Sequence, residues 1–472
     1  MILPTSYRDK TVAVMGLGKS GLIAAAALAA AGARVLAWDD GQAGRDAAAA
    51  RGCRVCDLLQ AEWQEIAALV LSPGIPHTHP VAHPVAAAAK AAGVPIIGDV
   101  DLLVRTRPQA RYIGITGTNG KSTTTALLGH ILRELGRPVA VGGNLGVPAL
   151  ALDPMDADGT YVLELSSFQL DLTPSLASDV AVLTNISADH LDRHGGMAGY
   201  IAAKRRLFDQ QRPGATAVIG TDDPDSAALC DAFSRDGARR VLPVSSGHRV
   251  RGGAYVIDGM LHDDLGGTNA PVLALADIPT LPGVHNHQNA AAAYAAARAA
   301  GLDAAGIARA IRSYPGLPHR QELVAEIDGV RYINDSKATN ADSAARALAC
   351  YDTIYWIAGG KPKEGGLDLL APYLRNVRHA FLIGEAAPAM RDDLARRGGP
   401  KTTMSGDLET ALGAAHAMAQ REGTPGAVVL LSPACASYDQ FANFEARGDR
   451  FRHAVGGLPG SVRRFAQSGR AA

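Results

Sequence analysis

The sequence predicts an α/β protein of three doubly wound domains: a Rossmann-like domain at residues 1–106, a central mononucleotide-binding domain with a phosphate loop at 107–316, and a Rossmann-like domain at 317–472. Two observations carry this prediction. Short apolar runs alternate with Ala-rich helical patterns along the chain, as in parallel sheets whose two faces are both covered by helices. The length of 472 residues also fits three domains of ~150 residues each.

The composition excludes several classes of protein. The formal net charge is +0, so we expect neither nucleic acid nor an anionic membrane as a partner. No apolar run is long and free enough of charge to span a bilayer, and Met1–Lys10 lacks the apolar stretch of a signal peptide. The 5 cysteines are scattered, which is typical of a reducing compartment, so we expect a cytoplasmic protein.

The first segment contains a glycine fingerprint between two predicted strands. Thr11–Met15 is followed by Gly16-Leu-Gly18-Lys-Ser-Gly21, a helical run, and a strand that ends at Asp39. This arrangement is typical of a dinucleotide site, but such a site requires about six strands. We find only four or five before the next phosphate loop, so a single nucleotide or a nucleoside diphosphate fits better. A purely structural turn is the alternative.

Two further patterns in this segment indicate little by themselves. Cys53 and Cys56 have the spacing of a redox motif, but no second pair completes a zinc site. His77, His79 and His83 crowd a Pro-rich loop, where solvated histidines are more common than metal ligands. We assign no function to either group.

The central segment contains the most informative stretch, Gly114-Ile-Thr-Gly-Thr-Asn-Gly-Lys-Ser-Thr-Thr-Thr125. It follows the predicted strand Arg111–Ile115 and opens a predicted helix, Thr123–Leu135. Glycines allow backbone N–H groups to surround a phosphate, Lys121 adds a positive charge, and Ser122 offers a hydroxyl to Mg²⁺. The stretch therefore predicts a nucleotide triphosphate site.

Two polar groups follow the next predicted strands. Glu164 interrupts an apolar strand, where a carboxylate is costly unless it is paired or bound to a metal. A nearby arginine or lysine is the alternative partner. His190, in the polar cluster Asp189-His190-Leu-Asp192-Arg-His194, is either a metal ligand or an ordinary loop histidine.

Lys204 lies in a predicted helix whose next two cations are arginines. Lysine can add CO₂ to its neutral amine and become a carbamate, whereas arginine cannot. Taken alone, however, this residue is best read as a solvated lysine.

The last segment begins after a Pro/Gly-rich linker, Tyr314–Pro318, and again alternates strands with helices. Most of its polar clusters also follow strands. Cys435 has no neighbouring histidine in the sequence, and we read it as a small buried residue. The predicted strands are Thr353–Ala358, Ala380–Gly384 and Ala427–Ser432.

Taken together, these strings resemble the Mur ligase family of peptidoglycan synthesis over nearly the whole chain, and within it the member that adds D-glutamate. The Asp-Asn-Pro-Arg motif of the diaminopimelate-adding relatives is absent. The strings that carry the resemblance are Gly117–Ser122, Glu164–Leu170, Asn185–Arg193, Ala203-Lys204, His285–Asn289, Gly316–Arg320, Asn334–Asn340, Ser432–Ser437, Asp439–Phe441 and Phe444-Glu445.

The resemblance implies an ATP-dependent acid–amino-acid ligase. ATP would phosphorylate the carboxylate of UDP-N-acetylmuramoyl-L-alanine, and the amine of D-glutamate would attack the acyl phosphate. The resemblance further implies two Mg²⁺ ions, a carbamylated Lys204 and a monomer with small-molecule substrates only. Folylpolyglutamate-type ligases and other Mur-type ligases are one alternative, although the folylpolyglutamate type lacks a segment like Gly16 to Asp39. A non-catalytic nucleotide-binding or NAD-linked protein is the other.

The resemblance also implies roles for individual residues. The catalytic residues would be Lys121, His190, Lys204 and Lys337, and the metal ligands Ser122, Glu164, His190 and Lys204. ATP would be bound by Gly117, Thr118, Asn119, Gly120, Lys121, Ser122, Thr123, Asn286, Asn289, Arg320 and Asp335. The uridine-linked substrate would be bound by Gly18, Lys19, Ser20, Asp39, Gly74 and Asn144, and D-glutamate by Thr339, Lys363, Ser437 and Phe444.

Two positions depart from the family pattern. Residue 41 is Gly where the family leads us to expect Arg, which leaves the uracil contacts open. Around Lys363 the string Gly-Gly-Lys-Pro-Lys-Glu differs from the familiar form, so Lys361 competes for the same role.

Overall fold

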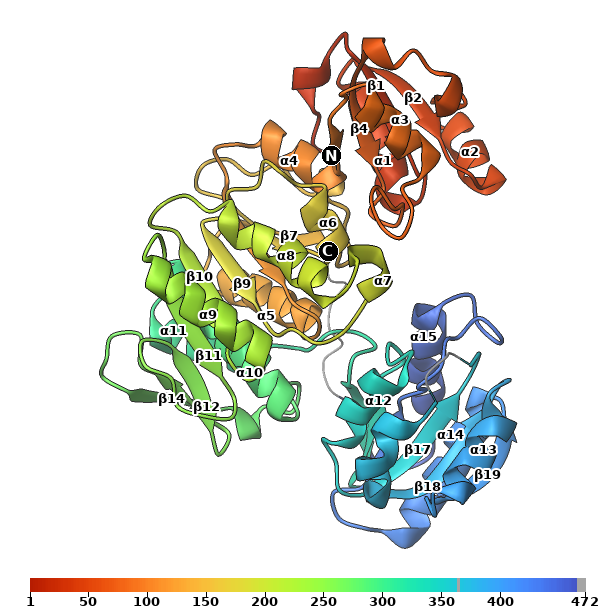
Figure 1. Cartoon of the computed structure of the whole chain (residues 1–472). Helices are drawn as coiled ribbons and strands as arrows, with labels where there is room; N and C mark the ends of the chain where they lie inside the picture. Colours follow the sequence, from red (N-terminus) through yellow and green to blue (C-terminus); the bar gives the residue numbers. More distant parts are fainter. Residues whose placement is uncertain (363–365, 465–472) are drawn as a thin grey trace. The chain divides into compact units, whose positions relative to one another are not determined.

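The computed structural model describes residues 1–362 and 366–464 of the chain. These form two compact units, one of residues 1–274 and 287–313, the other of residues 275–286 and those from 314 onward. The first unit contains two sheets and the second contains the third, each flanked by helices (Figure 1). The predicted α/β fold with three doubly wound sheets is confirmed.

The N-terminal sheet has five parallel strands in the order β3-β2-β1-β4-β5, in agreement with the count that argued against a dinucleotide site. Its strands are β1 Thr11–Met15, β2 Arg34–Trp38, β3 Arg54–Val55, β4 Ile66–Leu71 and β5 Ile96–Ile97. Its helices are α1 Lys19–Ala30, α2 Gln42–Ala49 and α3 Pro84–Ala91, with short 3₁₀ turns η1 Thr5–Tyr7, η2 Leu58–Gln60 and η3 Trp63–Glu65.

The central sheet has nine strands in the order β14-β13-β12-β11-β10-β9-β6-β8-β7, parallel except for the two pairs that β13 makes with β12 and β14. The strands are β6 Arg111–Thr116, β7 Val139–Gly143, β8 Thr160–Glu164, β9 Val180–Leu183, β10 Thr216–Gly220, β11 Arg240–Ser245, β12 Ala254–Ile257, β13 Met260–Asp263 and β14 Ala270–Ala274. The helices are α4 Asp99–Thr106, α5 Lys121–Glu134, α6 Ser167–Asp171, α7 Leu191–His194, α8 Met197–Asp209, α9 Pro224–Asp236, α10 Val284–Ala299 and α11 Ala304–Arg312, with η4 Ala149–Ala151. The turn η5 Leu275–Asp277 and the first residues of α10 belong to the second unit.

The third sheet has seven strands in the order β19-β18-β17-β20-β16-β15-β21, parallel except for the pairs that β15 makes. The strands are β15 Glu322–Ile327, β16 Val330–Asn334, β17 Ile354–Gly359, β18 Val377–Ile383, β19 Lys401–Gly406, β20 Val428–Leu431 and β21 Val462–Arg464. The helices are α12 Ala341–Leu348, α13 Ala387–Arg396, α14 Leu408–Glu422 and α15 Phe444–Val455, with η6 Asp368–Asn376.

Strand β17 shows why the strands read as continuous apolar runs. Ile354, Trp356 and Ala358 belong to a core on one face of the third sheet, whereas Tyr355 and Ile357 belong to a core on the other face. Successive side chains of a strand point to opposite faces, so covering both faces with helices requires every residue to be apolar.

Strands β10 to β14 extend the central sheet beyond the region that the sequence analysis described. The hairpin β13–β14 includes a register shift after Leu261, and the short strands β12 and β13 turn tightly at Asp258. Such short, irregular strands carry too few residues for periodicity to distinguish them from loops.

Two glycines of the N-terminal fingerprint have different structural roles. Gly21 lies within α1, where an added Cβ would come 1.8 Å from the Gly16 carbonyl oxygen. Gly18 caps the same helix with an ordinary negative φ, and an added Cβ would meet nothing within 4 Å. Gly21 therefore allows α1 to pack closely against the loop after β1, whereas Gly18 leaves open space at the helix start.

The Gly21→Ala variant should destabilise the N-terminal sheet by about 1–3 kcal/mol, because the added methyl group clashes with backbone. Without that clash, replacing a helical glycine with alanine would stabilise the fold by about 0.5–1 kcal/mol. The sign of the measured change in stability therefore shows whether the clash occurs. Hydrogen exchange of the α1 and β1 amides measures it, with Gly18→Ala as the matched control. Slower or unchanged exchange in Gly21→Ala would contradict the packing argument.

Candidate functional site

The phosphate loop lies between β6 and α5 and depends on two glycines. Gly117 has φ +143° and Gly120 has φ +83°, values that favour glycine. An added Cβ would lie 2.0 Å from Thr184 Oγ1 at Gly117 and 2.0 Å from Asn289 Oδ1 at Gly120. The loop thus has both the backbone freedom and the close neighbours that a phosphate cradle at a helix start requires.

Residues that follow β9 hold this loop in shape. The backbone amide of Asn119 donates to Asn185 Oδ1 at 2.9 Å, and Thr184 Oγ1 donates to the Asn119 carbonyl at 2.6 Å. The Thr118 amide donates to the Asn185 carbonyl at 2.9 Å. Because β9 pairs directly with β6, the end of one strand supports the loop that follows the other.

Two lysines, Lys121 and Lys204, donate to a single carbonyl oxygen in this loop. Lys121 Nζ lies 3.0 Å and Lys204 Nζ 2.7 Å from the Gly117 oxygen, and Lys121 also donates to the Thr118 carbonyl at 2.8 Å. Lys204 is 1% exposed on α8, so its reading as a solvated lysine is wrong: the helix turns this side chain toward the phosphate loop. Burial lowers the pKa of Lys204 well below its usual value, and the charge of Lys121 lowers it further.

Glu164, at the end of β8, has an incomplete set of partners. Its Oε1 accepts from Asn144 Nδ2 at 2.7 Å, whereas its Oε2 is buried and has no hydrogen-bond partner among the described residues. The side chain is 2% exposed, and Glu164 pairs in register with Ile115 of β6. A buried carboxylate oxygen without a donor is costly, and a cation would satisfy it.

His190 has a strained backbone, as the residue before α7, with φ +51°. Its side chain is 55% exposed, and Nε2 lies 3.6 Å from Asp189 Oδ2. A non-glycine residue in this region usually reflects a constraint on where the side chain must point. The structure thus gives His190 an accessible imidazole rather than a buried one.

The residues present fit a hard cation beside a phosphate group. Within the described ranges, no three or more His, Cys, Asp or Glu cluster as a complete metal site. The orphaned Glu164 oxygen and the buried Ser122 at the start of α5 instead offer an incomplete oxygen shell. Mg²⁺ is commonly held in this way, by one or two protein oxygens together with phosphates and waters.

Helix α10 contributes the two asparagines that were assigned to ATP. Asn289 is buried beside Gly120, and Thr124 Oγ1 donates to its Oδ1 at 3.5 Å. Asn286 belongs to the second unit, where its Nδ2 donates to the Pro282 carbonyl at 2.8 Å. Only Asn289 is therefore placed beside the phosphate loop by contacts within its own unit.

Asp335 follows β16 in the second unit and is 7% exposed. Its Oδ2 accepts from Ser432 Oγ at 2.8 Å, and its Oδ1 accepts from the Gln321 amide at 3.2 Å. Burial raises the pKa of Asp335 to about 7, opposed in part by these hydrogen bonds and by the charge of Arg320. The predicted ATP residues Arg320 and Asp335 are thus electrostatically coupled.

The loops after β16 and β20 bring together most residues assigned to D-glutamate. Lys337 Nζ lies 4.4 Å from the centre of the Phe444 ring, and the Thr339 amide donates to the Lys337 carbonyl at 2.8 Å. Ser437 is buried, and the neighbouring Ala436 forms a β-bridge with Lys361. Lys363 lies outside the described residues, so Lys361 is the candidate lysine that the structure places at these loops.

Arg447 was not singled out from the sequence. It is 1% exposed on α15, and its guanidinium donates to the Ser336 carbonyl at 2.8 Å and the Cys435 carbonyl at 3.2 Å. Ser336 Oγ donates in turn to the Phe444 carbonyl at 2.8 Å. The buried Arg447 guanidinium thus holds together the loops that carry Lys337, Ser437 and Phe444. Only the tertiary structure reveals this, since one arginine among many gives no local signal.

The glycine loop of the N-terminal sheet contains the uridine candidates. Asp39 accepts from the Leu17 amide at 2.5 Å and from the Gly41 amide at 2.7 Å, so its carboxylate braces this loop. Lys19 Nζ reaches the Gly146 carbonyl at 2.6 Å, just after Asn144. The other candidates lie at the same edge: Gly18 caps α1, Ser20 is in its first turn, and Gly74 follows β4.

Arg45 supplies a guanidinium close to the position where Gly41 departs from the family pattern. It lies 4.8 Å from the centre of the Trp38 ring and donates to the Asp39 carbonyl at 2.5 Å. Position 41 alone gives no sign of Arg45 in the sequence, whereas the first turn of α2 returns Arg45 to the same loop.

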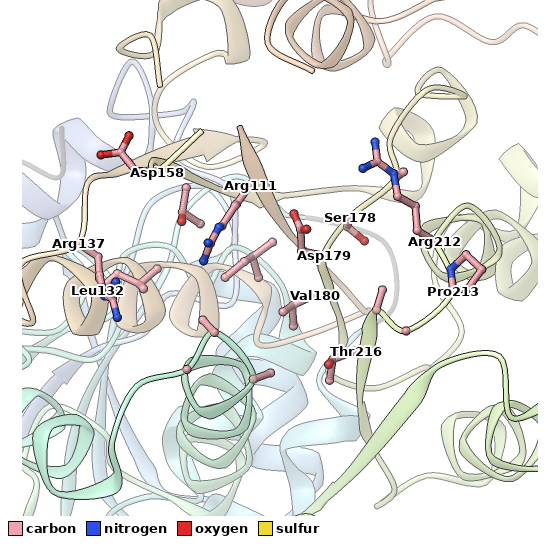
Figure 2. A pocket seen from close by; sticks show the side chains of 18 residues that line it. Arg111, Leu132, Arg137, Asp158, Ser178, Asp179, Val180, Arg212, Pro213 and Thr216 are labelled. Atoms are coloured by element: carbon pink, nitrogen blue, oxygen red, sulfur yellow. The ribbon is translucent and has the colours of Figure 1, made fainter. Parts of the chain in front are cut away.

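A crevice of about 570 Å³ lies at the other edge of the central sheet (Figure 2). It is lined by the starts of four neighbouring strands, among them Arg111 of β6 and Thr216 of β10. Ligands of parallel sheets meet the carboxyl ends of the strands, where the phosphate loop lies. The crevice is therefore separate from the candidate site.

The cysteine and histidine patterns of the N-terminal segment remain without a function. Burial raises the pKa of the Cys53 and Cys56 thiols, which opposes reactivity. His83 caps α3 and pairs with Asp40 at 3.0 Å, a structural role. In the described part of the chain, none of the helices has the length and apolar character needed to cross a membrane.

A family model matches most of the segment that contains each of the three sheets. Residues 10–98 match the Mur ligase MurD-like N-terminal domain, 115–297 the Mur ligase middle domain, and 319–435 the Mur ligase glutamate ligase domain. The UDP-N-acetylmuramoylalanine–D-glutamate ligase of Rhodospirillum rubrum is 56% identical, covering 96% of this chain and 95% of that protein. The enzyme of the same name from Caulobacter sp. is 51% identical, covering 97% and 98%.

Solved structures show the same fold at low identity. The UDP-N-acetylmuramate–alanine ligase of Thermotoga maritima has a TM-score of 0.59 at 17% identity, covering 95% of this chain and 99% of that chain. A D-alanyl-D-alanyl-adding ligase of Acinetobacter baumannii has a TM-score of 0.58 at 19% identity, covering 90% of each chain. At these identities the likeness concerns the fold alone.

The Asp335→Asn variant should raise the melting temperature at pH 8, and the gain should shrink toward pH 5. The folded protein holds the Asp335 proton up to a pKa of about 7, whereas an unfolded aspartate loses it near ~4. Stability from this group is therefore lost as pH rises through that window. Thermal unfolding across pH measures the difference, with the exposed Asp352→Asn as control. A gain that is equal at both pH values would contradict it.

Proposed function

This chain belongs to the Mur ligase family, and we propose that it is the enzyme of that family that adds D-glutamate to UDP-N-acetylmuramoyl-L-alanine. It is an ATP-dependent ligase that forms a peptide bond in the synthesis of peptidoglycan precursors. ATP activates the substrate carboxylate as an acyl phosphate and leaves as ADP. The amine of D-glutamate then attacks the carbonyl carbon, and phosphate departs from the tetrahedral intermediate.

The observation that supports this chemistry most directly is the pair of lysines on the Gly117 carbonyl, beside the orphaned oxygen of Glu164. Carboxylate activation brings two anions together, the γ-phosphate and the substrate carboxylate. The positive charge of Lys121, already in place at the loop, would lower the barrier to that step. Lys121 is positioned at the loop to contact the β- and γ-phosphates, and Gly117 to Thr123 to surround them.

The proposed metal ligands fall into two sets. Ser122 and Glu164 would hold one Mg²⁺, and His190 and a carbamylated Lys204 a second. These ions, when bound, neutralise phosphate charge and polarise the transferred phosphoryl group. Lys204 suits carbamylation because burial and the charge of Lys121 lower the pKa of its amine, and CO₂ adds to the neutral form of an amine. The product would carry a negative charge beside Lys121.

The three sheets would divide the substrates between them. Residues 1–106 would bind the uridine nucleotide through Gly18, Lys19, Ser20, Asp39 and Gly74, and Asn144 would contact the muramoyl group. Residues 107–316 would bind ATP, assisted by Asn286, Asn289, Arg320 and Asp335. Residues 317–472 would bind D-glutamate through Thr339, Ser437, Phe444 and a lysine, Lys363 or Lys361, with Lys337 at the reacting groups.

The protein would act in the cytoplasm as a monomer, with neither nucleic acid nor membrane as a partner. The net charge of +0 supports the absence of nucleic-acid and membrane partners, because the protein has no excess of positive charge that would attract a polyanionic surface. A folylpolyglutamate-type reaction is disfavoured, because the first 98 residues include a MurD-like N-terminal domain.

Phosphate release from ATP should require both UDP-N-acetylmuramoyl-L-alanine and D-glutamate in steady state. L-Glutamate, D-aspartate and meso-diaminopimelate should give much lower kcat/KM, because the Ser432 to Phe444 loops are matched to D-glutamate. A coupled phosphate assay with mass spectrometry of the product measures both. Equal kcat/KM with diaminopimelate or L-alanine would contradict the assignment.

Lys204→Ala and Lys204→Arg should both lose ligation, by about 10²-fold or more, as for other groups that stabilise transition-state charge. Arginine retains the positive charge but cannot form a carbamate. A loss of activity in Lys204→Arg therefore distinguishes a carbamylated lysine from one that acts through its positive charge. Added short-chain carboxylates should restore part of the activity of Lys204→Ala.

A ¹³C carbamate signal from labelled bicarbonate should be present in the parent and absent in both Lys204 variants. Arg205→Ala is the matched control, since Arg205 is the next residue of α8 and pairs with Asp209 on the surface. An active Lys204→Arg enzyme would refute the carbamate.

A further inference from the structure

Besides Ser122 at the start of α5, the proposed metal-binding side chains come from three separate segments of the first unit. Glu164 ends β8, His190 precedes α7, and Lys204 lies in α8. Metal and catalytic sites function only when their ligands are held to within about 0.5 Å. The three segments therefore need a common support that sets their relative positions.

His194, the last residue of α7, contacts a neighbour of each ligand. Its side chain is 4% exposed, and Nε2 lies 2.9 Å from Ser167 Oγ. Its ring stacks on Phe168 with centres 5.3 Å apart and an angle of 15°. The His194 ring also contacts Tyr200, and the centres of these two rings lie 5.5 Å apart.

Each of these three neighbours leads to one proposed ligand. Ser167 begins α6, directly after the turn that follows Glu164. The Phe168 ring centre lies 5.1 Å from that of His190. The Tyr200 ring lies under the Lys204 ammonium, 4.4 Å from Nζ, and its hydroxyl lies 3.1 Å from Thr118 Oγ1 in the phosphate loop. One imidazole thus connects all three segments.

We infer that His194 is a positioning residue, which holds the Glu164, His190 and Lys204 segments in register for binding Mg²⁺. The inference rests on the proposed function, since it concerns the same metal ions. Groups that orient metal ligands typically contribute 10–100-fold to metal affinity or activity.

A different role for the same contacts can be set aside. Ser167, His194 and Asp171 resemble a nucleophile, base and acid, with His194 Nδ1 3.7 Å from Asp171 Oδ2. Ser167 is only 3% exposed, however, and Asp171 is already paired with Arg206 at 3.1 Å. A nucleophile must reach a substrate carbon, so the arrangement supports structure rather than acyl transfer.

The test compares two substitutions of His194. His194→Phe keeps the stacked ring but removes the hydrogen bond, which leaves Ser167 Oγ without this partner. We expect the Mg²⁺ concentration for half-maximal activity to rise about tenfold or more, with KM for D-glutamate unchanged. His194→Gln places an amide near Nε2 and should restore much of the Mg²⁺ dependence.

A direct measurement of metal binding accompanies the kinetics. Enzyme-bound Mn²⁺ is counted by electron paramagnetic resonance, with a non-hydrolysable ATP analogue present. His194→Phe should bind Mn²⁺ more weakly than the parent, and His194→Gln nearly as the parent does. A role confined to folding would lower the melting temperature without shifting either titration.

His416→Phe is the matched control. His416 is also buried, and its Nδ1 lies 2.6 Å from Tyr332 Oη in the second unit. The variant loses an equivalent hydrogen bond, so it should lose stability and keep the parental Mg²⁺ and Mn²⁺ titrations.

Parental titrations in His194→Phe, or an equal shift in His416→Phe, would overturn the positioning role. A parent that shows no Mg²⁺-dependent ligation would instead contradict the proposed function itself, so the two failures are distinguishable.

Discussion

Two lysine nitrogens donate to one carbonyl oxygen, that of Gly117, and the arrangement of the phosphate loop depends on this constraint. Lys204 is buried and Lys121 is half-buried, and burial together with the charge of Lys121 lowers the pKa of Lys204. The loop that presents the Gly117 oxygen is held in shape by hydrogen bonds with Thr184 and Asn185. The loop thus holds one charged lysine next to a lysine whose neutral form is favoured.

Neighbouring strands supply the remaining parts because their carboxyl ends meet at one edge. Strand β6 lies between β8 and β9, so Glu164 and the Thr184 support flank the phosphate loop although they are far apart in sequence. The third sheet also brings side chains together at the carboxyl ends of neighbouring strands. Strands β16 and β20 are neighbours, and Asp335 and Ser432, which directly follow them, form a hydrogen bond.

Where sequence reasoning succeeded, the signal was local. The glycine loops, the apolar strands and the isolated Glu164 each require particular residues within a short stretch, because backbone conformation and burial on both faces act over a few residues. Strands β10 to β14 lacked such a signal, since they are short and irregular. Arg45, His194 and Arg447 were given no role from the sequence. His194 and Arg447 act by joining segments distant in sequence. Arg45 contacts Trp38 and Asp39, a few residues before it, through the turn that begins α2.

The sequence by itself thus determined the fold class and the phosphate loop, because each follows from local chemistry or from a motif of contiguous residues. The metal ligands were predicted from the family resemblance. Only the tertiary structure decided that Lys204 is buried on the Gly117 carbonyl, that one Glu164 oxygen has no donor in the described chain, and that His194 touches three segments at once. These facts depend on which strands are neighbours and on what covers them. The packing of the whole chain sets both, and no short stretch of residues encodes either.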